Sequence, residues 1–454
     1  MTLIKPLRVF PFVMLLLWVS YGQGQEVGDA ASQPLLLTLD NAIALALQQN
    51  RDILIAQQDR ERADAQVGEA RAGAFPQLSI AGSYTRNIRK PVLFLPPHNP
   101  INPSDETVAF EIGSSNAYVM GAQVSQALFN RKLGTALAIA KTWRELTAQS
   151  YQATTQQVVR EVKRSFYLIL LMQKLVEANR QGLEVVRANY ENVQAQYRNG
   201  MVAEYDLLRA EVQLANTEPL LITAENNCQL AVNALKNLLS IPLDQEVRVQ
   251  GEFAFAGIGD GVKDEARRNA LLANPVILQL GLQESMLEKN ILIEKAGYFP
   301  TLSMFGGYQW QAQDNTYRFG NYNWAKMLNV GLNLSYPLFD GFRTRERVQQ
   351  ATIDRDKVRY TRLKVEEGLK IQIQSAELKM AEAEKRIRGQ EKNIEQAQKA
   401  VHIAQTRFKS GVGTQLELLD AQVAMTRAQT NYAQAIYDYL MARADWQYAV
   451  GMIK

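Results

Sequence analysis

Four segments of the chain alternate apolar residues with polar or small ones at a period of two. The clearest is LNVGLNLSYP at 328–337, in which every second residue is leucine, valine or tyrosine. The others lie at 77–86, 117–126 and 301–310. This period, held over about ten residues, is typical of transmembrane β-strands with one lipid-facing and one wet face. A half-buried strand of a soluble sheet is the alternative, and the small residues on the wet face favour the membrane.

Two other segments have a helical period. Apolar residues recur every seven positions over 162–197 and again over 373–408, and an alanine-rich stripe accompanies the second set. Such stripes form a coiled-coil seam. They predict long helices at 131–199 and 341–410, each of about 69 residues and about 100 Å. The core of a soluble bundle would show similar stripes, but the length favours a coiled coil.

The chain contains two copies of one unit. RFKSGVGTQLELLDAQ at 407–422 resembles QYRNGMVAEYDLLRAE at 196–211, about 211 residues earlier. AFPQLS at 74–79 pairs with YFPTLS at 298–303 at an offset of about 224 residues. A Pro-rich insertion at 87–115 accounts for the change of offset. The units are a first repeat at 25–240 and a second at 263–454. A linker at 241–262 joins them, and we expect it to pack around the middle of the molecule.

Each repeat predicts an opening helix, a β-hairpin, the long helix and a returning helix. The opening helices should cover 41–73 and 263–297, with Asp40 as the N-cap of the first. The hairpins fall at 77–126 and 301–337. The returning helices, at 203–240 and 414–451, are shorter than the long ones. An opening and a returning helix laid end to end match one long helix, so the pattern predicts a helical wall about 100 Å long with the hairpins at one end.

Four strands are too few to close a barrel in a membrane. Known barrels begin at about eight strands, and lipid does not tolerate an open sheet edge. If the four strands span a membrane, several chains must share one barrel. The sequence therefore predicts an α+β membrane protein that is an obligate oligomer.

The first residues have the pattern of a secretory signal peptide at 1–24. Lys5 and Arg8 precede the short apolar run VFPFVMLLLWV, and small residues that suit cleavage follow. A membrane anchor is the alternative, but the run is shorter than the ~20 residues that span a bilayer. No later segment has enough consecutive apolar residues to form a transmembrane helix. The net charge of +4 gives no argument for nucleic acid. The single cysteine, Cys228, excludes an internal disulfide.

The sequence contains no arrangement of residues that suits catalysis. The two histidines, His98 and His402, fall in a loop and in a heptad helix, remote from each other and from Cys228. No metal-ligand cluster, phosphate-binding glycine loop or nucleophile elbow is present. We therefore expect no enzyme activity, no cofactor and no metal.

Over essentially its whole length after residue 24, the chain resembles the TolC-like outer membrane efflux protein family. The resemblance rests on FPxLS at 75–79 and 299–303, on SxxLF at 125–129 and 335–339, and on GVGTQLELLDAQ at 411–422. It implies a homotrimer in which three chains give four strands each to a twelve-stranded barrel in outer-membrane lipid. Twelve helices would continue as an α-barrel into the periplasm.

The same resemblance implies the function and the partners. The chain would be the outer-membrane exit channel of a tripartite export machine, which passes small molecules or secreted polypeptides to the exterior. A periplasmic adaptor protein and an inner-membrane pump would dock at the helical tip. The competing class is a non-conducting coiled-coil or adhesin-like envelope protein, which would tolerate loss of the residues at the tip.

The resemblance places a pore constriction at Glu417 and Asp420, which are three residues apart and so lie on one helix face. Three copies of both acids would focus a negative potential across the entrance and favour cations. Two solvated acids near a helix N-terminus are the alternative. Gly200 and Gly411 mark the turns where the long helices reverse, because glycine suits the left-handed residue that ends many helices.

The tip also departs from the family pattern. Some members latch the closed tip with a tyrosine and an arginine, where this chain has Phe408 and Gly413, so we expect that latch to be absent. Asp206, the acidic counterpart of the latch in the first repeat, is present. The helix-tip turns that would dock the adaptor therefore comprise Gly200, Asp206, Gly411 and Gly413. Pro219 falls inside the first returning helix, where it should bend the helix.

Overall fold

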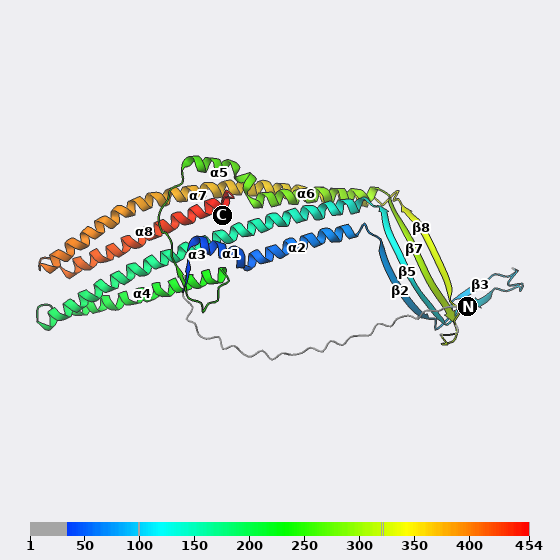
Figure 1. Cartoon of the computed structure of the whole chain (residues 1–454), viewed down its shortest axis with the longest axis horizontal. Coiled ribbons are helices and arrows are strands. Elements are labelled where there is room, and N and C mark those ends of the chain that lie inside the picture. The colour runs from blue at the N-terminus through cyan, green and yellow to red at the C-terminus, as the bar shows by residue number, and fades with distance from the viewer. Residues whose placement is uncertain (1–33, 99, 319, 321, 454) are drawn as a thin grey trace, which may run out of the picture.

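The computed structural model describes residues 34–98, 100–318, 320 and 322–453, and the predicted signal peptide at 1–24 lies outside this part. The molecule is elongated, with a sheet at one end of a long helical part (Figure 1). The helices of the first repeat are α1 Leu39–Gln49, α2 Arg51–Ala72, α3 Arg131–Arg198 and α4 Glu204–Leu238. Those of the second are α5 Asp260–Ala273, α6 Pro275–Lys295, α7 Arg343–Lys409 and α8 Gln415–Ala449.

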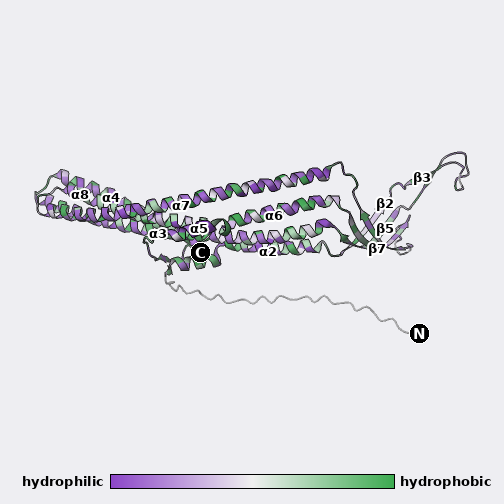
Figure 2. Ribbon diagram, turned by 90° about the horizontal axis from the view of Figure 1, so that it is seen from above, coloured by the Kyte–Doolittle hydropathy of each residue, from purple (hydrophilic) through white to green (hydrophobic). Residues whose placement is uncertain are grey.

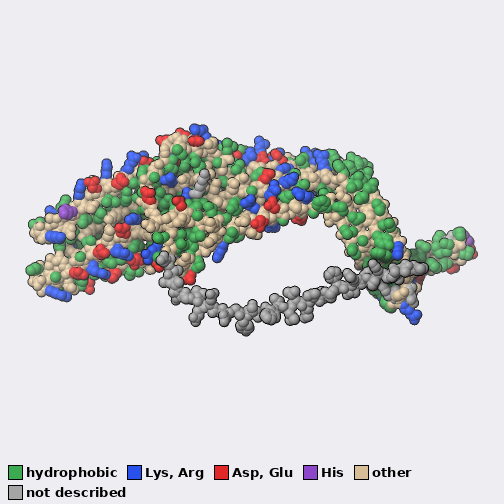
Figure 3. Space-filling model, in the orientation of Figure 1, with side chains coloured by type: hydrophobic (Ala, Val, Ile, Leu, Met, Phe, Trp, Pro, Cys, Tyr) green, Lys and Arg blue, Asp and Glu red, His purple; other side chains and the backbone are tan. Residues whose placement is uncertain are grey.

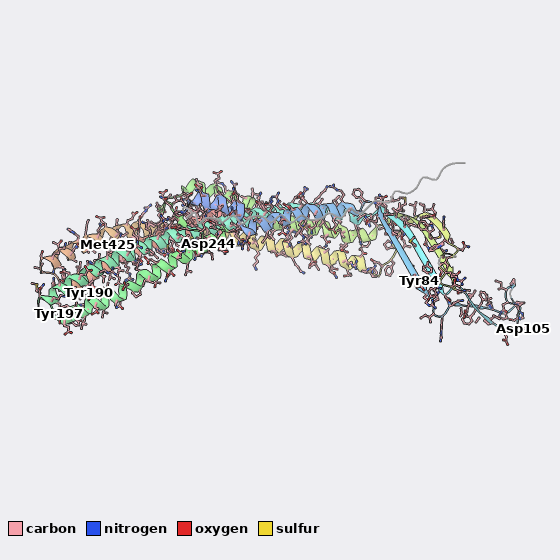
Figure 4. All side chains as sticks on the ribbon, turned by 60° about the horizontal axis from the view of Figure 1, so that its bottom comes forward. Tyr84, Asp105, Tyr190, Tyr197, Asp244 and Met425 are labelled. Carbon is pink, nitrogen blue, oxygen red and sulfur yellow. The ribbon has the colours of Figure 1, made fainter. Side chains whose placement is uncertain are left out.

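The two long helices, α3 and α7, are the backbone of the helical part. In each repeat the returning helix packs against the half of the long helix far from the sheet (Figure 1). Helices α2 and α6 pack against the halves near the sheet, and α3 also contacts α6 and α8 of the second repeat. The predicted seam of α7 is buried at Ile373, Met380 and Ile387, which are at most 3% exposed, and half-buried nearer the tip. In α3 the corresponding stripe is buried at its start but reaches the surface at Tyr197, near the tip (Figure 4).

The opening helix of the first repeat is two helices, which corrects the prediction of one continuous helix at 41–73. Asn50 lies between α1 and α2 in an extended conformation. Its side-chain oxygen accepts hydrogen bonds from the N–H groups of Asp52 and Ile53, and its amide donates to the Leu238 carbonyl at 2.8 Å. The buried asparagine therefore both begins α2 and ties the break to the end of α4.

The second repeat breaks its opening helix in the same way, so the prediction of a single helix at 263–297 was also wrong. Asn274, 5% exposed, accepts from the Val276 N–H at 3.0 Å and donates to the Ala449 carbonyl at 3.1 Å. A buried amide that lost these partners would carry a desolvation cost of about 1–3 kcal/mol. Both repeats thus join the opening helix to the returning helix through one buried asparagine.

A short parallel ladder and the linker cross the middle of the helices. Strand β1, Leu35–Leu37, pairs with β6, Val247–Val249. Thr38, not Asp40, is the N-cap of α1, because its hydroxyl accepts from the Asn41 N–H. Farther along the linker, the Ala256 carbonyl accepts a hydrogen bond from the buried Tyr439 hydroxyl at 2.9 Å. These contacts lie in the region where the cores of the two repeats meet.

The sheet joins the hairpins of both repeats. It is antiparallel, with the order β2-β5-β7-β8, and its strands are Gln77–Arg86, Asn116–Phe129, Thr301–Asp314 and Ala325–Ser335. Central strands β5 and β7 pair with each other, so each repeat contributes one central and one edge strand. Within the described residues, no strand pairs with the outer edge of β2 or of β8.

The register gives the sheet one apolar and one polar or small face. Leu334 lies opposite Leu302 and Leu332 opposite Met304 on one face, whereas Asn333 lies opposite Ser303 on the other. This arrangement confirms the predicted alternation. On the apolar face, four residues of β8 are 66–75% exposed: Leu328, Val330, Leu332 and Leu334. Figure 3 shows the visible side of the sheet largely covered by hydrophobic side chains, while charged side chains are spread over the helices.

Aromatic rings gather at both ends of the sheet. At the end away from the helices, Tyr84 stacks on Tyr118 at 4.8 Å between ring centroids, and Tyr118 lies 5.4 Å from Tyr322 (Figure 4). At the helical end, the exposed rings of Phe339 and Phe342 are 5.4 Å apart. Aromatic belts on both sides of an apolar strand face are typical of membrane interfaces.

The insertion at 87–115 forms a second, smaller hairpin beyond the sheet. Strands β3, Val92–Leu95, and β4, Val108–Glu111, pair in an antiparallel ladder. Near the end of the hairpin, the 4% exposed Asn102 donates hydrogen bonds to three backbone carbonyls. This hairpin projects from the end of the molecule (Figure 1).

Hydrophilic residues occur along the full length of every long helix (Figure 2). Among the described residues, no helix combines the length and the apolar character that crossing a membrane requires.

Candidate functional site

The long helices reverse at two turns that lie together at the end of the molecule opposite the sheet (Figure 1). We call residues 199–203, between α3 and α4, the first tip turn, and residues 410–414, between α7 and α8, the second tip turn. These turns contain or adjoin every site residue that the sequence predicts.

The two tip turns share a left-handed glycine and the same pair of backbone hydrogen bonds. Gly200 has a φ of 69° and Gly411 a φ of 74°, the left-handed conformation expected for both. Both turns also have the two hydrogen bonds of a Schellman motif. Gly200 and Gly411 donate to the third carbonyl before them, and the next residues, Met201 and Val412, donate to the fifth, at 2.9–3.1 Å.

The acids predicted to form the constriction lie at the start of α8. Thr414 is the N-cap, and its hydroxyl accepts from the Glu417 N–H at 3.2 Å. Leu418 and Leu419 are buried, whereas Glu417 and Asp420 are exposed on the same side of the helix. The structure thus brings the two predicted acids together at the surface of the tip.

Arg407, which sequence reasoning missed, lies beside Glu417 at the end of α7. Its Nε is 3.5 Å from Oε2 of Glu417, and its Nη2 donates to the Val412 carbonyl at 3.4 Å. The guanidinium therefore contacts both the second tip turn and the start of α8. Aligning the repeats at their offset of about 211 residues would have revealed it. In that alignment Arg407 corresponds to Gln196, and Glu417, ten residues after Arg407, corresponds to Asp206.

Gly413 is required for space rather than for backbone freedom. A Cβ at this position would lie 2.8 Å from the Arg407 Cβ and 3.0 Å from the Phe408 nitrogen. The first distance is shorter than real Cβ contacts and the second is tighter than most of them, so a side chain would push the turn away from α7. The corresponding residue in the first tip turn is Val202, so the first turn has no such close approach.

Asp206 lies in the first turn of α4 without the support that Glu417 has. The N-cap of α4 is Ala203, which makes no side-chain capping bond. Asp206 forms no ion pair with any other described residue. The predicted effect of Pro219 is limited, because α4 remains one helix across it and the Thr223 hydroxyl donates to the Pro219 carbonyl.

Behind the tips, ion pairs join the helices of each repeat. Arg180 pairs with Glu225 at 2.9 Å between α3 and α4, and Arg386 with Asp438 at 2.8 Å between α7 and α8. Farther toward the middle, burial lowers the pKa of the Lys163 amine. The described residues contain no group of three or more His, Cys, Asp or Glu that could hold a metal ion.

These features define a class of protein. Its sheet has an apolar face that suits lipid, and its long helices end in glycine turns about 100 Å from the sheet. The outer membrane efflux protein family matches residues 42–240 and 266–451. The outer membrane protein TolC of Vibrio cholerae is 22% identical over 420 residues, covering 90% of this chain and 89% of its own length. The alkaline protease secretion protein AprF of Pseudomonas aeruginosa is 24% identical over 343 residues, covering 74% and 70%.

A solved structure shows the same fold. The CmeC outer membrane channel of Campylobacter jejuni superposes with a TM-score of 0.73 at 20% identity, covering 91% of this chain and 85% of its own. The chain therefore belongs to the outer membrane efflux protein family. It is an outer-membrane protein with a helical extension into the periplasm, and it serves transport rather than catalysis.

Proposed function

We propose that three copies of this chain form a continuous duct through the outer membrane and the periplasm. The observation that carries the proposal is the sheet, which has one apolar face and two outer edges that pair with no other strand of the described residues. Strand β8 of one copy would pair with β2 of the next, and three sheets would close a twelve-stranded barrel. Closure gives the backbone N–H and C=O groups of every strand edge a hydrogen-bond partner, which lipid cannot supply. The two tandem repeats of each chain would supply the wall of the α-barrel below it.

The tips would form the periplasmic entrance of this duct. A trimer has six tip turns, and Gly200, Asp206, Gly411 and Gly413 belong to the surface that would dock a periplasmic adaptor. An inner-membrane pump would deliver the cargo through that adaptor. Glu417 and Asp420 would line the constriction, because both are exposed on one side of α8 at the tip.

The cargo would be small molecules or secreted polypeptides. The name of AprF refers to secretion of a protease, and CmeC is described as an outer membrane channel. The duct would provide the passage for either kind of cargo, while the pump would select it.

Single-channel recording in planar bilayers tests the proposal. The native protein should give small, cation-selective openings, and Glu417→Ala/Asp420→Ala should give larger and less selective ones, since a constriction lined with negative charge favours cations. A large native conductance that the double substitution leaves unchanged would keep the channel and refute the acidic constriction. A folded trimer without conductance would instead support the non-conducting, adhesin-like alternative.

A further inference from the structure

The two tips place their acids in different surroundings although both turns have a left-handed glycine and the same two Schellman hydrogen bonds. In the second tip, Arg407 extends from the last turn of α7 toward Glu417, with 3.5 Å between Nε and Oε2. In the first tip, Gln196 occupies the corresponding position, and its side chain donates to Asn192 on its own helix. One acid is therefore held by a cation and its counterpart is not.

Arg407 joins three parts of the second tip at once. Its carbonyl accepts hydrogen bonds from the N–H groups of Val412 at 3.1 Å and Gly413 at 3.0 Å, while its guanidinium donates to the Val412 carbonyl. Its side chain also reaches Glu417 across the turn. The missing side chain of Gly413 is what lets the turn approach α7 this closely.

We propose that Arg407 is a positioning residue of the entrance: it holds Glu417 against the second tip turn and leaves Asp420 as the free acid of the pair. This inference rests on the proposed function, because it assigns the two acids different parts in the constriction. Glu417 and Arg407 form a nearly neutral clamp that fixes the turn. Asp420, which forms no ion pair with the other described residues, supplies the negative charge that passing ions meet.

The Arg407–Glu417 pair is too exposed to contribute much to the stability of the whole chain. Arg407 and Glu417 are 52% and 48% exposed, and such pairs contribute little to overall stability. Their effect is local, because the pair spans the turn at which two helices reverse. Releasing Glu417 would add a mobile carboxylate to a narrow entrance, where charge is focused and strongly affects ion selectivity.

A double-mutant cycle tests the clamp with two independent readouts. Arg407→Gln, Glu417→Gln and the double variant are compared with the native full-length trimer. Lys409→Gln is the matched control, because Lys409 has the same charge, lies two residues farther along α7 and forms no ion pair within the described part of the chain. Amide hydrogen exchange of residues 411–416 reports on the turn, and the potassium-to-chloride permeability ratio reports on the entrance.

The clamp predicts a non-additive cycle. Exchange in 411–416 should accelerate about two- to fivefold in each single variant and no further in the double variant, the range for a half-exposed ion pair. Lys409→Gln should leave exchange at the native rate. The permeability ratio should rise in Arg407→Gln, fall in Glu417→Gln and return to near the native value in the double variant.

The two readouts separate failure of the clamp from failure of the proposed function. Additive exchange effects, or equal acceleration by Lys409→Gln, would overturn the clamp even if the channel conducts. A permeability ratio that rises equally in Lys409→Gln and Arg407→Gln would reduce Arg407 to a general surface charge and also overturn it. Non-additive exchange in a trimer that never conducts would preserve the pairing and refute the proposed duct.

Discussion

The first and second tip turns reverse their helices through the same glycine motif but differ in the side chains that contact the returning helix. Both use a left-handed glycine and the same pair of Schellman hydrogen bonds. Among the residues that the structure describes, only the second turn has a capping N-cap side chain, that of Thr414, and an ion pair across the turn. The repeat therefore preserves what the helix reversal requires. The N-cap hydroxyl and the ion pair to the returning helix belong to the second tip, whereas the side chain of Asn199 in the first tip donates to the Ala195 carbonyl at 2.9 Å. The second tip should be the more rigid of the two.

Exchanging proline between the returning helices is the strongest test of this comparison. Thr430 of α8 corresponds to Pro219 of α4 at the offset of about 211 residues. Thr430→Pro should destabilise α8 locally by about 3 kcal/mol or more, because it removes a helical N–H and crowds the preceding turn. Hydrogen exchange along 415–449 measures the effect.

The reverse substitution is the control. Pro219→Thr restores the missing N–H in α4 and should slow exchange in that helix. If Thr430→Pro leaves exchange in α8 unchanged, packing by neighbouring chains sets the stability of this helix, and the proline of α4 does not distinguish the two returning helices.

A smaller effect is expected from filling the space at Gly413. Gly413→Ala places a Cβ 2.8 Å from the Arg407 Cβ, and overpacking of this kind costs about 1–3 kcal/mol. The second tip turn should then exchange faster, approaching the first. Gly389→Ala is the matched control, because a Cβ there meets nothing within 4 Å and should stabilise α7 by up to about 1 kcal/mol. Equal effects of both substitutions would show that Gly413 has no special role in space.

The sequence predicted what depends on local periodicity and failed where distant contacts decide. The alternation at 328–337 predicted a strand with one apolar face, because neighbouring residues of a strand always point to opposite sides. The break at Asn50 was missed, since it depends on the Leu238 carbonyl 188 residues away. A helical period continues through an asparagine, so the pattern at 41–73 gave no sign of two helices.

The candidate site shows the same limit. The positions of Gly200 and Gly411 follow from local turn chemistry, and the repeat marks them twice. The contact between Arg407 and Glu417 requires the turn to bring two helices together, which no single-helix pattern encodes. The closing of the barrel depends on other chains. It can therefore be inferred from one sequence only by the argument that lipid does not tolerate open strand edges.

The smallest effect, and the finest test of the two tips, comes from exchanging their N-caps. Thr414→Ala removes the hydroxyl that accepts from the Glu417 N–H and should cost about 1 kcal/mol at the start of α8. Ala203→Thr should give α4 a similar gain, because the N-cap there makes no side-chain bond. Hydrogen exchange in the first turn of each helix should therefore shift in opposite directions. If both substitutions instead accelerate exchange, the first tip turn cannot accommodate a capping side chain, and the difference between the tips extends to their backbones.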